Sequence, residues 1–323
     1  MTTAPHARPA GAVLITGSGS GIGAATAVAA AQAGYRVVAT VYSLDRAEDL
    51  RARIAAGGPG LSVDIRELDV TREEQIAAVV ADVVTDYGAL HGVISNAGVT
   101  LMATFESESL ASYRRVFEVN FFGPVAVLKQ AMPHLRASGG RIIAVGSING
   151  VLGLPFQESY GASKFALEGL LESLAPVARR LGVAVSVVSP GHVSGTAIFR
   201  DHDPNRFLAE APEPYGAVID EYFGNWSSGD VTDVPATQPV TEVAEIIVGV
   251  LASADPGFRY TTSPAGHQLL AHKLLDPTGN ALARRIGGWL DPTTRRPVPV
   301  DGVPVDGEPA DGVAGADSDA VLR

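Results

Sequence analysis

The chain has 323 residues, 46% of them hydrophobic, and a formal net charge of −11 at pH 7. The acidic surplus argues against a nucleic-acid partner, which would need a basic face, and the absence of cysteine excludes disulfides, thiolate zinc sites and cysteine nucleophiles. The seven histidines are dispersed, so no metal site is expected. No apolar run reaches the roughly 20 residues that span a bilayer, and residues 1–10 lack a signal-peptide core, so we expect a cytoplasmic protein without a membrane span.

Strands and helices alternate along the chain. Residues 12–15 form an apolar run typical of a buried strand, and the alanine-rich residues 24–31 predict a helix. Further strands are predicted at residues 37–41, 62–67, 92–95, 141–146, 184–189 and 258–262, and further helices at 72–87, 107–136, 159–181 and 240–252. Pro133 and Pro176 should end or kink two of these helices. The alternation predicts an α/β fold, a doubly wound parallel sheet with helices on both faces, in a single domain of residues 11–290.

Three segments break the alternation. Residues 1–10 are expected to be disordered. Residues 196–239 form a long insert, which we expect to be a helical lid over the substrate; its aromatic residues, which could instead pack on the core, are Phe199, Phe207, Tyr215, Tyr222, Phe223 and Trp226. Residues 291–323 contain five prolines, four glycines, seven acidic residues and no aromatic residue, so they predict a disordered acidic tail.

A glycine-rich loop joins the first predicted strand to the first helix. Its sequence is Thr16-Gly17-Ser18-Gly19-Ser20-Gly21-Ile22-Gly23. Glycines at such a turn let the backbone approach a pyrophosphate, which then lies at the positive end of the helix. The spacing is G-x-x-x-G-x-G rather than the commonest G-x-G-x-x-G, and a strand–helix turn without a ligand is the alternative. The candidate dinucleotide-binding residues of this loop are Gly17, Ser18, Ser20, Gly21, Ile22 and Gly23.

A second motif is suited to proton transfer. Tyr160 and Lys164 lie one helical turn apart on a predicted helix, and Ser147 follows a predicted strand. A free tyrosine titrates near 10, too high for an efficient base at neutral pH, and lowering its pKa by about three units takes about 4 kcal/mol. The ammonium of Lys164 shifts the pKa in this direction. Ser147 lies where open sheets bind ligands and can hold the substrate oxygen against Tyr160, or it can be an ordinary turn residue.

Together the two motifs resemble the short-chain dehydrogenase/reductase family. The same pattern includes Leu68-Asp69-Val70, Asn96-Ala97-Gly98, Asn120 and Pro190-Gly191, and the resemblance covers about residues 11–290. The segments 153–156, 162–170, 258–262 and 276–279 are similar to the branch that contains type 1 17β-hydroxysteroid dehydrogenase and the photoreceptor-type retinol dehydrogenases. The resemblance implies a Rossmann-type fold and a catalytic set of Asn120, Ser147, Tyr160 and Lys164, in which Asn120 holds a water that links Lys164 to solvent.

The resemblance also implies which residues contact a nicotinamide dinucleotide. Asp69 and Val70 would hold the adenine, and Lys164 would reach the nicotinamide ribose. The residues that follow the fourth strand and would pack near the ribose are Asn96, Ala97 and Gly98. The carboxamide would meet Pro190, Gly191, Val193 and Thr196; because the threonine comes one residue later than is usual, Ser194 is an alternative for that contact. The family forms homodimers or homotetramers through the helices predicted at 107–136 and 159–181, and we expect the same here.

The end of the second predicted strand bears on the choice of cofactor. An acidic residue there would bind the ribose 2′-hydroxyl of NAD and repel the 2′-phosphate of NADP. This chain has Thr40-Val41-Tyr42-Ser43, with neither an acid nor an arginine. Without an acid to exclude phosphate, NADP is favoured over NAD, with four donors in reach: Ser20, Tyr42, Ser43 and Arg46.

These observations predict an NAD(P)-dependent oxidoreductase. Its substrate would be a secondary alcohol or ketone of a bulky apolar molecule, such as a steroid, a retinoid or a polyketide, with Tyr160 as the acid or base. One alternative is a non-catalytic dinucleotide-binding sensor or scaffold, which the complete catalytic set argues against. Another is a sugar-nucleotide epimerase of the related extended family, whose usual Gly-x-x-Gly-x-x-Gly spacing is absent from this loop.

Overall fold

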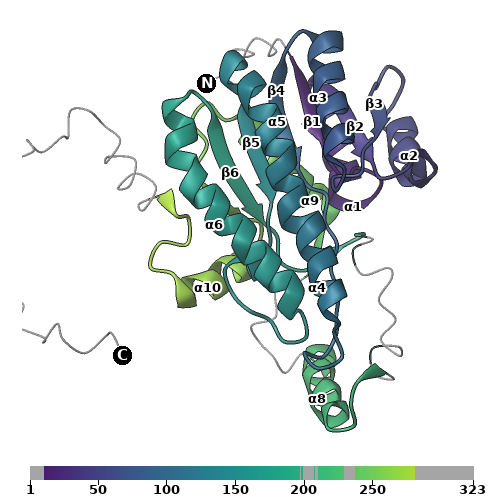
Figure 1. Ribbon diagram of the computed structural model, residues 1–323, viewed down its shortest axis with the longest axis vertical. Coiled ribbons are helices and arrows are strands. Elements are labelled where there is room, and N and C mark those ends of the chain that lie inside the picture. The colour runs from purple at the N-terminus through teal and green to yellow at the C-terminus, as the bar shows by residue number, and fades with distance from the viewer. Residues whose placement is uncertain (1–10, 197, 199–206, 208–209, 229–236, 281–323) are drawn as a thin grey trace, which may run out of the picture.

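The core of the protein is a seven-stranded parallel sheet (Figure 1), in a computed structural model that describes residues 11–196, 198, 207, 210–228 and 237–280. The strand order is β3-β2-β1-β4-β5-β6-β9, so the chain winds outward from β1 in both directions. The strands are β1 (Ala12–Ile15), β2 (Arg36–Val41), β3 (Asp64–Glu67), β4 (Leu90–Ser95), β5 (Arg141–Val145), β6 (Ala184–Ser189) and β9 (Arg259–Thr261). The predicted α/β fold with a doubly wound parallel sheet is confirmed, and the boundary between β1 and β4 is where such sheets bind ligands.

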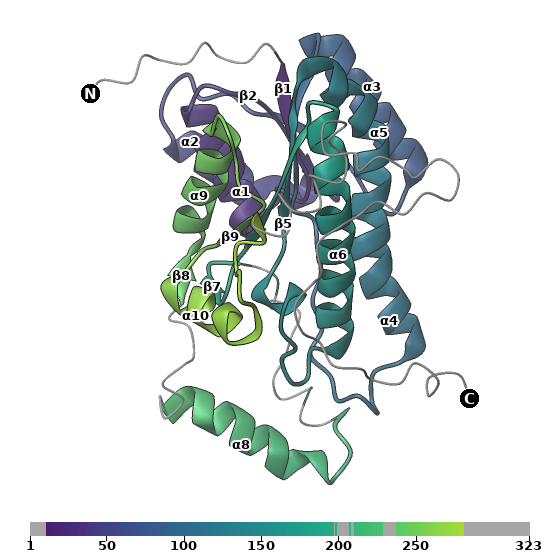
Figure 2. The ribbon, with the colours of Figure 1, turned by 90° about the vertical axis from the view of Figure 1, so that its left-hand side faces the viewer.

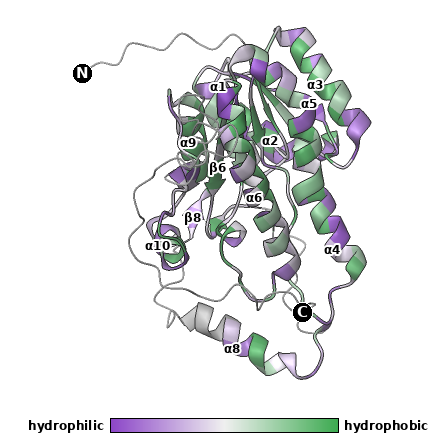
Figure 3. Cartoon of the chain, turned by 60° about the vertical axis from the view of Figure 1, so that its left-hand side comes forward, coloured by the Kyte–Doolittle hydropathy of each residue, from purple (hydrophilic) through white to green (hydrophobic). Residues whose placement is uncertain are grey.

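Helices cover both faces of the sheet (Figure 2). One layer holds α1 (Gly21–Gln32), α2 (Glu48–Ala56) and α9 (Val240–Ala252), and the other holds α3 (Glu73–Tyr87), α5 (Gly123–Ser138) and α6 (Glu158–Arg180). Alternate residues of each strand enter different cores: Leu14 packs with the α3–α5–α6 layer and Ile15 with the α1–α2–α9 layer. Because both faces of the central strands are buried, β1, β4, β5 and β6 are mostly hydrophobic, whereas the helices also carry hydrophilic residues (Figure 3). The edge strand β3 is only partly buried and has the sequence Asp-Ile-Arg-Glu.

The helix predicted at 107–136 is divided in the structure. It consists of α4 (Leu110–Phe117), a π-helical turn η2 (Glu118–Phe122) and α5, which follow one another without a break. Of the predicted ending or kinking at Pro133 and Pro176, the ending does not occur, because α5 continues to Ser138 and α6 to Arg180; a local kink stays a prediction. Both prolines lie near the carboxyl ends of their helices, so the hydrogen bond that each removes is among the last of its helix.

Two short strands fix the ends of the long insert. β7 (Val193–Ser194) pairs in parallel with β8 (Gln238–Pro239), so the chain leaves the body and returns to it at one place. Between them lies α8 (Tyr215–Ser228), beyond the carboxyl ends of the sheet strands (Figure 2). The remaining elements are the 3-10 helices η1 (Leu44–Ala47) and η3 (Ile148–Gly150) and the helix α10 (Pro264–Lys273). The predicted disorder of residues 1–10 and 291–323 concerns segments outside the described residues, and the single-domain boundaries stay a prediction.

Candidate active site

The loops that follow β1, β4, β5 and β6 meet at one edge of the sheet. The glycine loop follows β1, the Asn96 segment follows β4, Ser147 follows β5 and the Pro190 loop follows β6. Backbone hydrogen bonds join these loops in pairs: Thr16 N donates to Ile94 O at 3.0 Å, and Ile148 N donates to Pro190 O at 3.0 Å. Residues that are far apart in sequence are therefore brought together where parallel strands end.

The glycine loop is packed tightly against the segment after β4. Gly17 has φ +68°, and a Cβ built there would lie 2.6 Å from the Cα of Ala97. The side-chain amide of Asn96 donates to the carbonyls of Thr16 and Gly17, both at 2.9 Å. The hydroxyl of Ser18 donates to Ile15 O at 3.1 Å, so it supports the turn rather than facing outward. The loop is thus a preformed backbone cradle.

The start of α1 fits a dinucleotide pyrophosphate. Ser20 is the N-cap residue, but its side chain accepts no capping hydrogen bond, so the side chain satisfies none of the first backbone N–H groups of α1. Such groups, with the positive end of the helix, attract a phosphate. Gly21 has φ +60°, and a Cβ there would lie 3.3 Å from the Cα of Thr196, so the segment after β6 reaches this loop. Both hydroxyls donate hydrogen bonds close by, Ser194 to Gln238 O at 3.3 Å and Thr196 to Val193 O at 3.4 Å, so both residues stay candidates for the cofactor contact.

The residues predicted at the adenine end are also near one another. Asp69 Oδ1 accepts hydrogen bonds from the backbone N (2.9 Å) and the hydroxyl (2.7 Å) of Thr71. Val70 packs against α5, where a Cβ on Gly123 would lie 2.9 Å from its side chain. Tyr42 is 60% exposed, and the guanidinium of Arg46 lies 5.7 Å from the centre of its ring. A cation therefore stands at the end of β2, where the sequence has no acid.

Tyr160, Lys164 and Ser147 converge as predicted. Tyr160 and Lys164 are buried on successive turns of α6, and the Ser147 hydroxyl is hydrogen-bonded to the Tyr160 hydroxyl. Lys164 Nζ donates to Val145 O at 3.0 Å, at the last residue of β5, and lies 5.8 Å from the centre of the Tyr160 ring. A hydroxyl pair able to hold and protonate a substrate oxygen is thus placed beside a buried ammonium.

Burial dominates the acid–base properties of the two ionisable groups. It raises the pKa of Tyr160, and the hydrogen bond with Ser147 opposes this shift. Burial therefore opposes the lowering of the Tyr160 pKa that is expected from Lys164, and that effect of the lysine stays a prediction. Burial also lowers the pKa of Lys164 to about 8, against the attraction of Glu168. The charge of Lys164 is consequently sensitive to pH near neutrality.

Asn120 is buried in the π turn, and its side chain is fully used. Its Oδ1 accepts from Val99 N and its Nδ2 donates to Val99 O, both at 2.8 Å. Nδ2 also donates to the hydroxyl of Ser163 at 3.0 Å. A Cβ on Gly98 would lie 3.3 Å from Asn120 Oδ1 and 3.7 Å from Lys164 Nζ, so the three residues adjoin. The side chain holds the segment after β4 in place, and the water-holding role stays a prediction.

Three residues that were not singled out from the sequence also belong to this region. Phe156 has φ +63° and is buried, and its ring contacts Phe207 (5.5 Å between centres) and Tyr222 (5.4 Å) of the insert. Glu168 and Arg259 form a buried ion pair one turn beyond Lys164. The four-residue spacing from Tyr160 to Lys164 to Glu168 was an available signal for Glu168, but not for its pairing with Arg259.

The structure describes the side chains of only some of the aromatic residues of the insert. Phe207 and Tyr222 pack on Phe156, and Tyr215 donates a hydrogen bond to Glu106 Oε1 at 3.0 Å. Phe199 lies outside the described residues, as do the side chains of Phe223 and Trp226. The ring contacts join the insert to the loop that precedes Tyr160, and the hydrogen bond to Glu106 joins it to the segment before α4.

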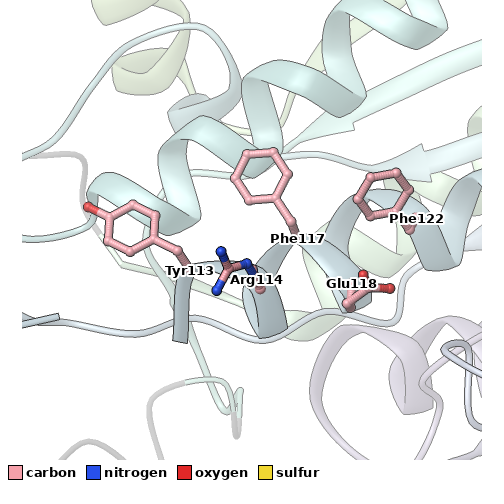
Figure 4. A pocket seen from close by; sticks show the side chains of 5 residues that line it. All are labelled: Tyr113, Arg114, Phe117, Glu118 and Phe122. Carbon is pink, nitrogen blue, oxygen red and sulfur yellow. The ribbon is translucent and has the colours of Figure 1, made fainter. Parts of the chain in front are cut away.

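An aromatic groove lies on α4 and η2 (Figure 4). It has a volume of about 250 Å³ and is lined by Tyr113, Arg114, Phe117, Glu118 and Phe122. Phe122 is 51% exposed, and Phe165 on α6 is 39% exposed. These helices are the ones through which a homodimer or homotetramer is predicted, and that assembly stays a prediction. Sedimentation of the full chain as a single monomeric species would contradict it.

Two further properties concern the part of the chain that the structure describes. Within it, no group of three or more histidine or carboxylate side chains is placed to hold a metal ion. None of the helices in that part is long and apolar enough to cross a membrane. The cytoplasmic location expected from the sequence stays a prediction.

Most of the chain matches proteins of one kind. Residues 11–206 match the family model described as short chain dehydrogenase. Retinol dehydrogenase 8 from Bos taurus is 35% identical in a match that covers 77% of this chain and 80% of that protein. Estradiol 17-beta-dehydrogenase 1 from Rattus norvegicus is 34% identical, over 76% of this chain and 71% of that protein. The crystal structure of levodione reductase is similar with a TM-score of 0.67 and 25% identity, over 81% of this chain and 98% of that chain.

The tight packing of the glycine loop leads to a stability prediction. Gly17→Ala should lower the free energy of unfolding by more than Gly139→Ala. Both positions have positive φ, +68° and +63°, where a side chain costs roughly 1–2 kcal/mol. Only at Gly17 would the methyl group collide with backbone, 2.6 Å from the Cα of Ala97, since the nearest atom at Gly139 is 4.0 Å away. Urea denaturation of both variants measures the difference, and equal losses would contradict the prediction.

Proposed function

The chain belongs to the short-chain dehydrogenase family, in the branch of its retinol and hydroxysteroid dehydrogenase relatives, and is an oxidoreductase; we propose that Tyr160 is its catalytic acid and base. The observation that carries this proposal is the buried group of Ser147, Tyr160 and Lys164, at the sheet edge where the glycine loop also lies. The proposed reaction is hydride transfer between a nicotinamide dinucleotide and a secondary alcohol or ketone.

The residues of the chain divide the work as follows. A bound nicotinamide supplies or accepts the hydride at the substrate carbon. In ketone reduction, Tyr160 gives its hydroxyl proton to the carbonyl oxygen, which becomes the alcohol, and the phenolate left behind is stabilised by Lys164. Ser147 holds the same oxygen by a hydrogen bond. In alcohol oxidation the proton moves the other way, and Tyr160 must begin as the phenolate.

The dinucleotide would be held along the edge already described. The backbone at the start of α1, with Gly17 to Gly23, would take the pyrophosphate. Asp69 and Val70 would hold the adenine, and Lys164 the nicotinamide ribose. The carboxamide would meet the segment from Pro190 to Thr196. These roles rest on the uncapped end of α1 and on the approach of Thr196 to Gly21.

We infer NADP as the preferred cofactor. No acid ends β2, and the backbone of Arg46 approaches the glycine loop, where a Cβ on Gly19 would lie 2.8 Å from Arg46 O. Its guanidinium lies beside Tyr42 and would pair with a 2′-phosphate. The Ser43 hydroxyl is hydrogen-bonded to Asp45, so Arg46 and Tyr42 are the stronger candidates for this contact.

The proposed substrate is a bulky apolar alcohol or ketone. Phe156 comes four residues before Tyr160, and it carries the described aromatic contacts with the insert. Aromatic side chains bury large apolar areas, at about 25 cal/mol per Å². The relatives named for retinol and estradiol support the same class of substrate. The insert would close over the apolar part of the molecule while its reacting carbon lies at Tyr160.

The first prediction tests the proton transfer. Tyr160→Phe should lower kcat by roughly 10²–10⁴ while dinucleotide binding is kept, because only the hydroxyl is removed. Turnover is followed at the NAD(P)H absorbance band with a panel of ketones and alcohols, and binding by calorimetry. Tyr87→Phe is the control. It also removes a tyrosine hydroxyl, which in the parent lies at the end of α3 and donates to Asp64 Oδ2 on β3 at 3.1 Å. Turnover of Tyr160→Phe within tenfold of the parent would exclude Tyr160 as the acid–base catalyst.

The second prediction concerns the cofactor. Arg46→Ala should raise KM for NADP by roughly tenfold or more, the value of a hydrogen bond to a charged group, with little effect on KM for NAD. Arg53→Ala is the matched control. This substitution also removes a positive charge, but from a side chain on α2 that is paired with Asp49. A parallel change of both KM values, or a native preference for NAD, would contradict the proposed selectivity.

The third prediction concerns the insert. Replacing residues 198–236 by a short glycine–serine linker leaves Thr196 and the β7–β8 pair in place. KM should then rise far more for bulky apolar ketones than for small ones, because only large substrates lose buried area. Steady-state kinetics with ketones of increasing apolar size measure the effect. Equal losses for small and large ketones would show that the insert is structural.

A further inference from the structure

A carboxylate is buried one helical turn beyond Lys164. Glu168 is 6% exposed and Lys164 is 5% exposed, and both lie on α6 at the four-residue spacing that makes side chains neighbours. Glu168 Oε1 accepts from Arg259 Nε at 2.7 Å and lies 2.5 Å from the second guanidinium nitrogen. Arg259 comes from β9 and is itself 7% exposed. The pair is therefore shielded from water, where a charge interacts strongly with its neighbours.

Only one oxygen of this carboxylate is occupied. Glu168 Oε2 is buried and has no hydrogen-bond partner among the described residues. It lies toward η3, where a Cβ on Gly150 would be 3.5 Å away and would also be 3.1 Å from the Lys164 carbonyl. A purely structural clamp would be expected to satisfy both oxygens, because an unpaired buried oxygen is costly. Arg259 therefore holds one oxygen of the carboxylate, and no donor among the described residues occupies the other.

We propose that Glu168, held by Arg259, is a positioning residue that keeps Lys164 positively charged beside Tyr160. The inference rests on the proposed role of Lys164 in the reaction. Burial disfavours the ammonium, and the carboxylate is the charge that offsets it. Arg259 in turn keeps the carboxylate ionised, because burial alone would favour its protonated form. Arg259 thus stabilises the charge of Glu168, Glu168 stabilises the charge of Lys164, and Lys164 acts on Tyr160 at the reacting oxygen.

Among the described residues, three charged groups act on the Glu168 carboxyl: Arg259, Lys164 and Glu172. Burial raises its pKa, and Arg259 and Lys164 lower it, while Glu172 on the next turn of α6 raises it. The elements η3 and β6, which pack against α6, carry no ionisable side chain. The charged residues of α4 and η2, which also pack against α6, are not among the groups that act on this carboxyl: Arg114, Arg115 and Glu118. The attraction between Glu168 and Lys164 also raises the pKa of the lysine.

The first measurement reads the charge of Lys164 directly and needs no turnover. The chain has three lysines, so lysine-selective ¹³C labelling gives three side-chain NMR signals, assigned by the variants Lys129→Arg and Lys273→Arg. Glu168→Gln keeps the size and one acceptor oxygen but removes the charge, and it should lower the pKa of Lys164 by about one unit. Glu168→Gln combined with Arg259→Met should lower it less, because no unpaired guanidinium remains.

Glu172→Gln is the matched control for this titration. It removes the same charge from the same helix, 3.9 Å from the same guanidinium, but from a partly exposed position two turns from Lys164. It should leave the pKa of Lys164 unchanged. An unchanged pKa in Glu168→Gln, or an equal shift in both variants, would overturn the proposal whether or not the protein turns over a ketone.

The second measurement separates an electrostatic role from a structural one. In Glu168→Gln the alkaline limb of kcat/KM for ketone reduction should move to lower pH by about one unit, with kcat near the parent value at acidic pH. A clamp that only supports the fold would lower kcat at every pH and leave the limb in place. If Lys164 titrates as expected but no substrate turns over, the proposed function fails and the charge relation stands.

Discussion

A lysine ammonium buried at the carboxyl end of a parallel sheet is the constraint around which this site is arranged. A charge removed from water must be compensated by nearby dipoles or opposite charges. Lys164 donates a hydrogen bond to Val145 O at the end of β5, and the charge of Glu168, one turn along the same helix, attracts the ammonium. Gly98 leaves open the space next to Nζ, which any side chain there would restrict. The backbone around the lysine is thus selected for close approach as much as for strand or helix formation.

The same constraint explains why distant segments are held so firmly. Asn120 hydrogen-bonds both backbone groups of Val99, so the turn after β4 cannot move away from the lysine. Asn96 holds the glycine loop in a similar way, because its side-chain amide donates to the carbonyls of Thr16 and Gly17. Asn96, which follows β4, and Asn120 on η2 therefore link the glycine loop to α6 through the segment after β4. The chemistry does not depend on one rigid element but on a chain of backbone contacts between strand ends.

The sequence was sufficient for features that repeat locally. Apolar runs alternating with helical patterns predicted six of the sheet strands beside β1 to within a few residues, and the spacing of Tyr160 and Lys164 placed both on one face of a helix. Features that depend on partners far along the chain were missed. Glu168 and Arg259 are 91 positions apart, and no local pattern indicates that they meet. β7 and β8 have two residues each, too few for a periodic signal. The raised pKa of Tyr160 arises from packing, which residue types alone do not specify.

The pairing of β7 with β8 also affects how this protein can diversify. The segment between β7 and β8 starts and ends at one short parallel strand pair. Its length therefore has little effect on stability, since closing a loop twice as long costs only about 0.6 kcal/mol more. Insertions and deletions there leave the hydrogen-bond register of the seven-stranded sheet untouched. The length and sequence of this segment can therefore change while the seven-stranded sheet and the group of Ser147, Tyr160 and Lys164 keep their positions.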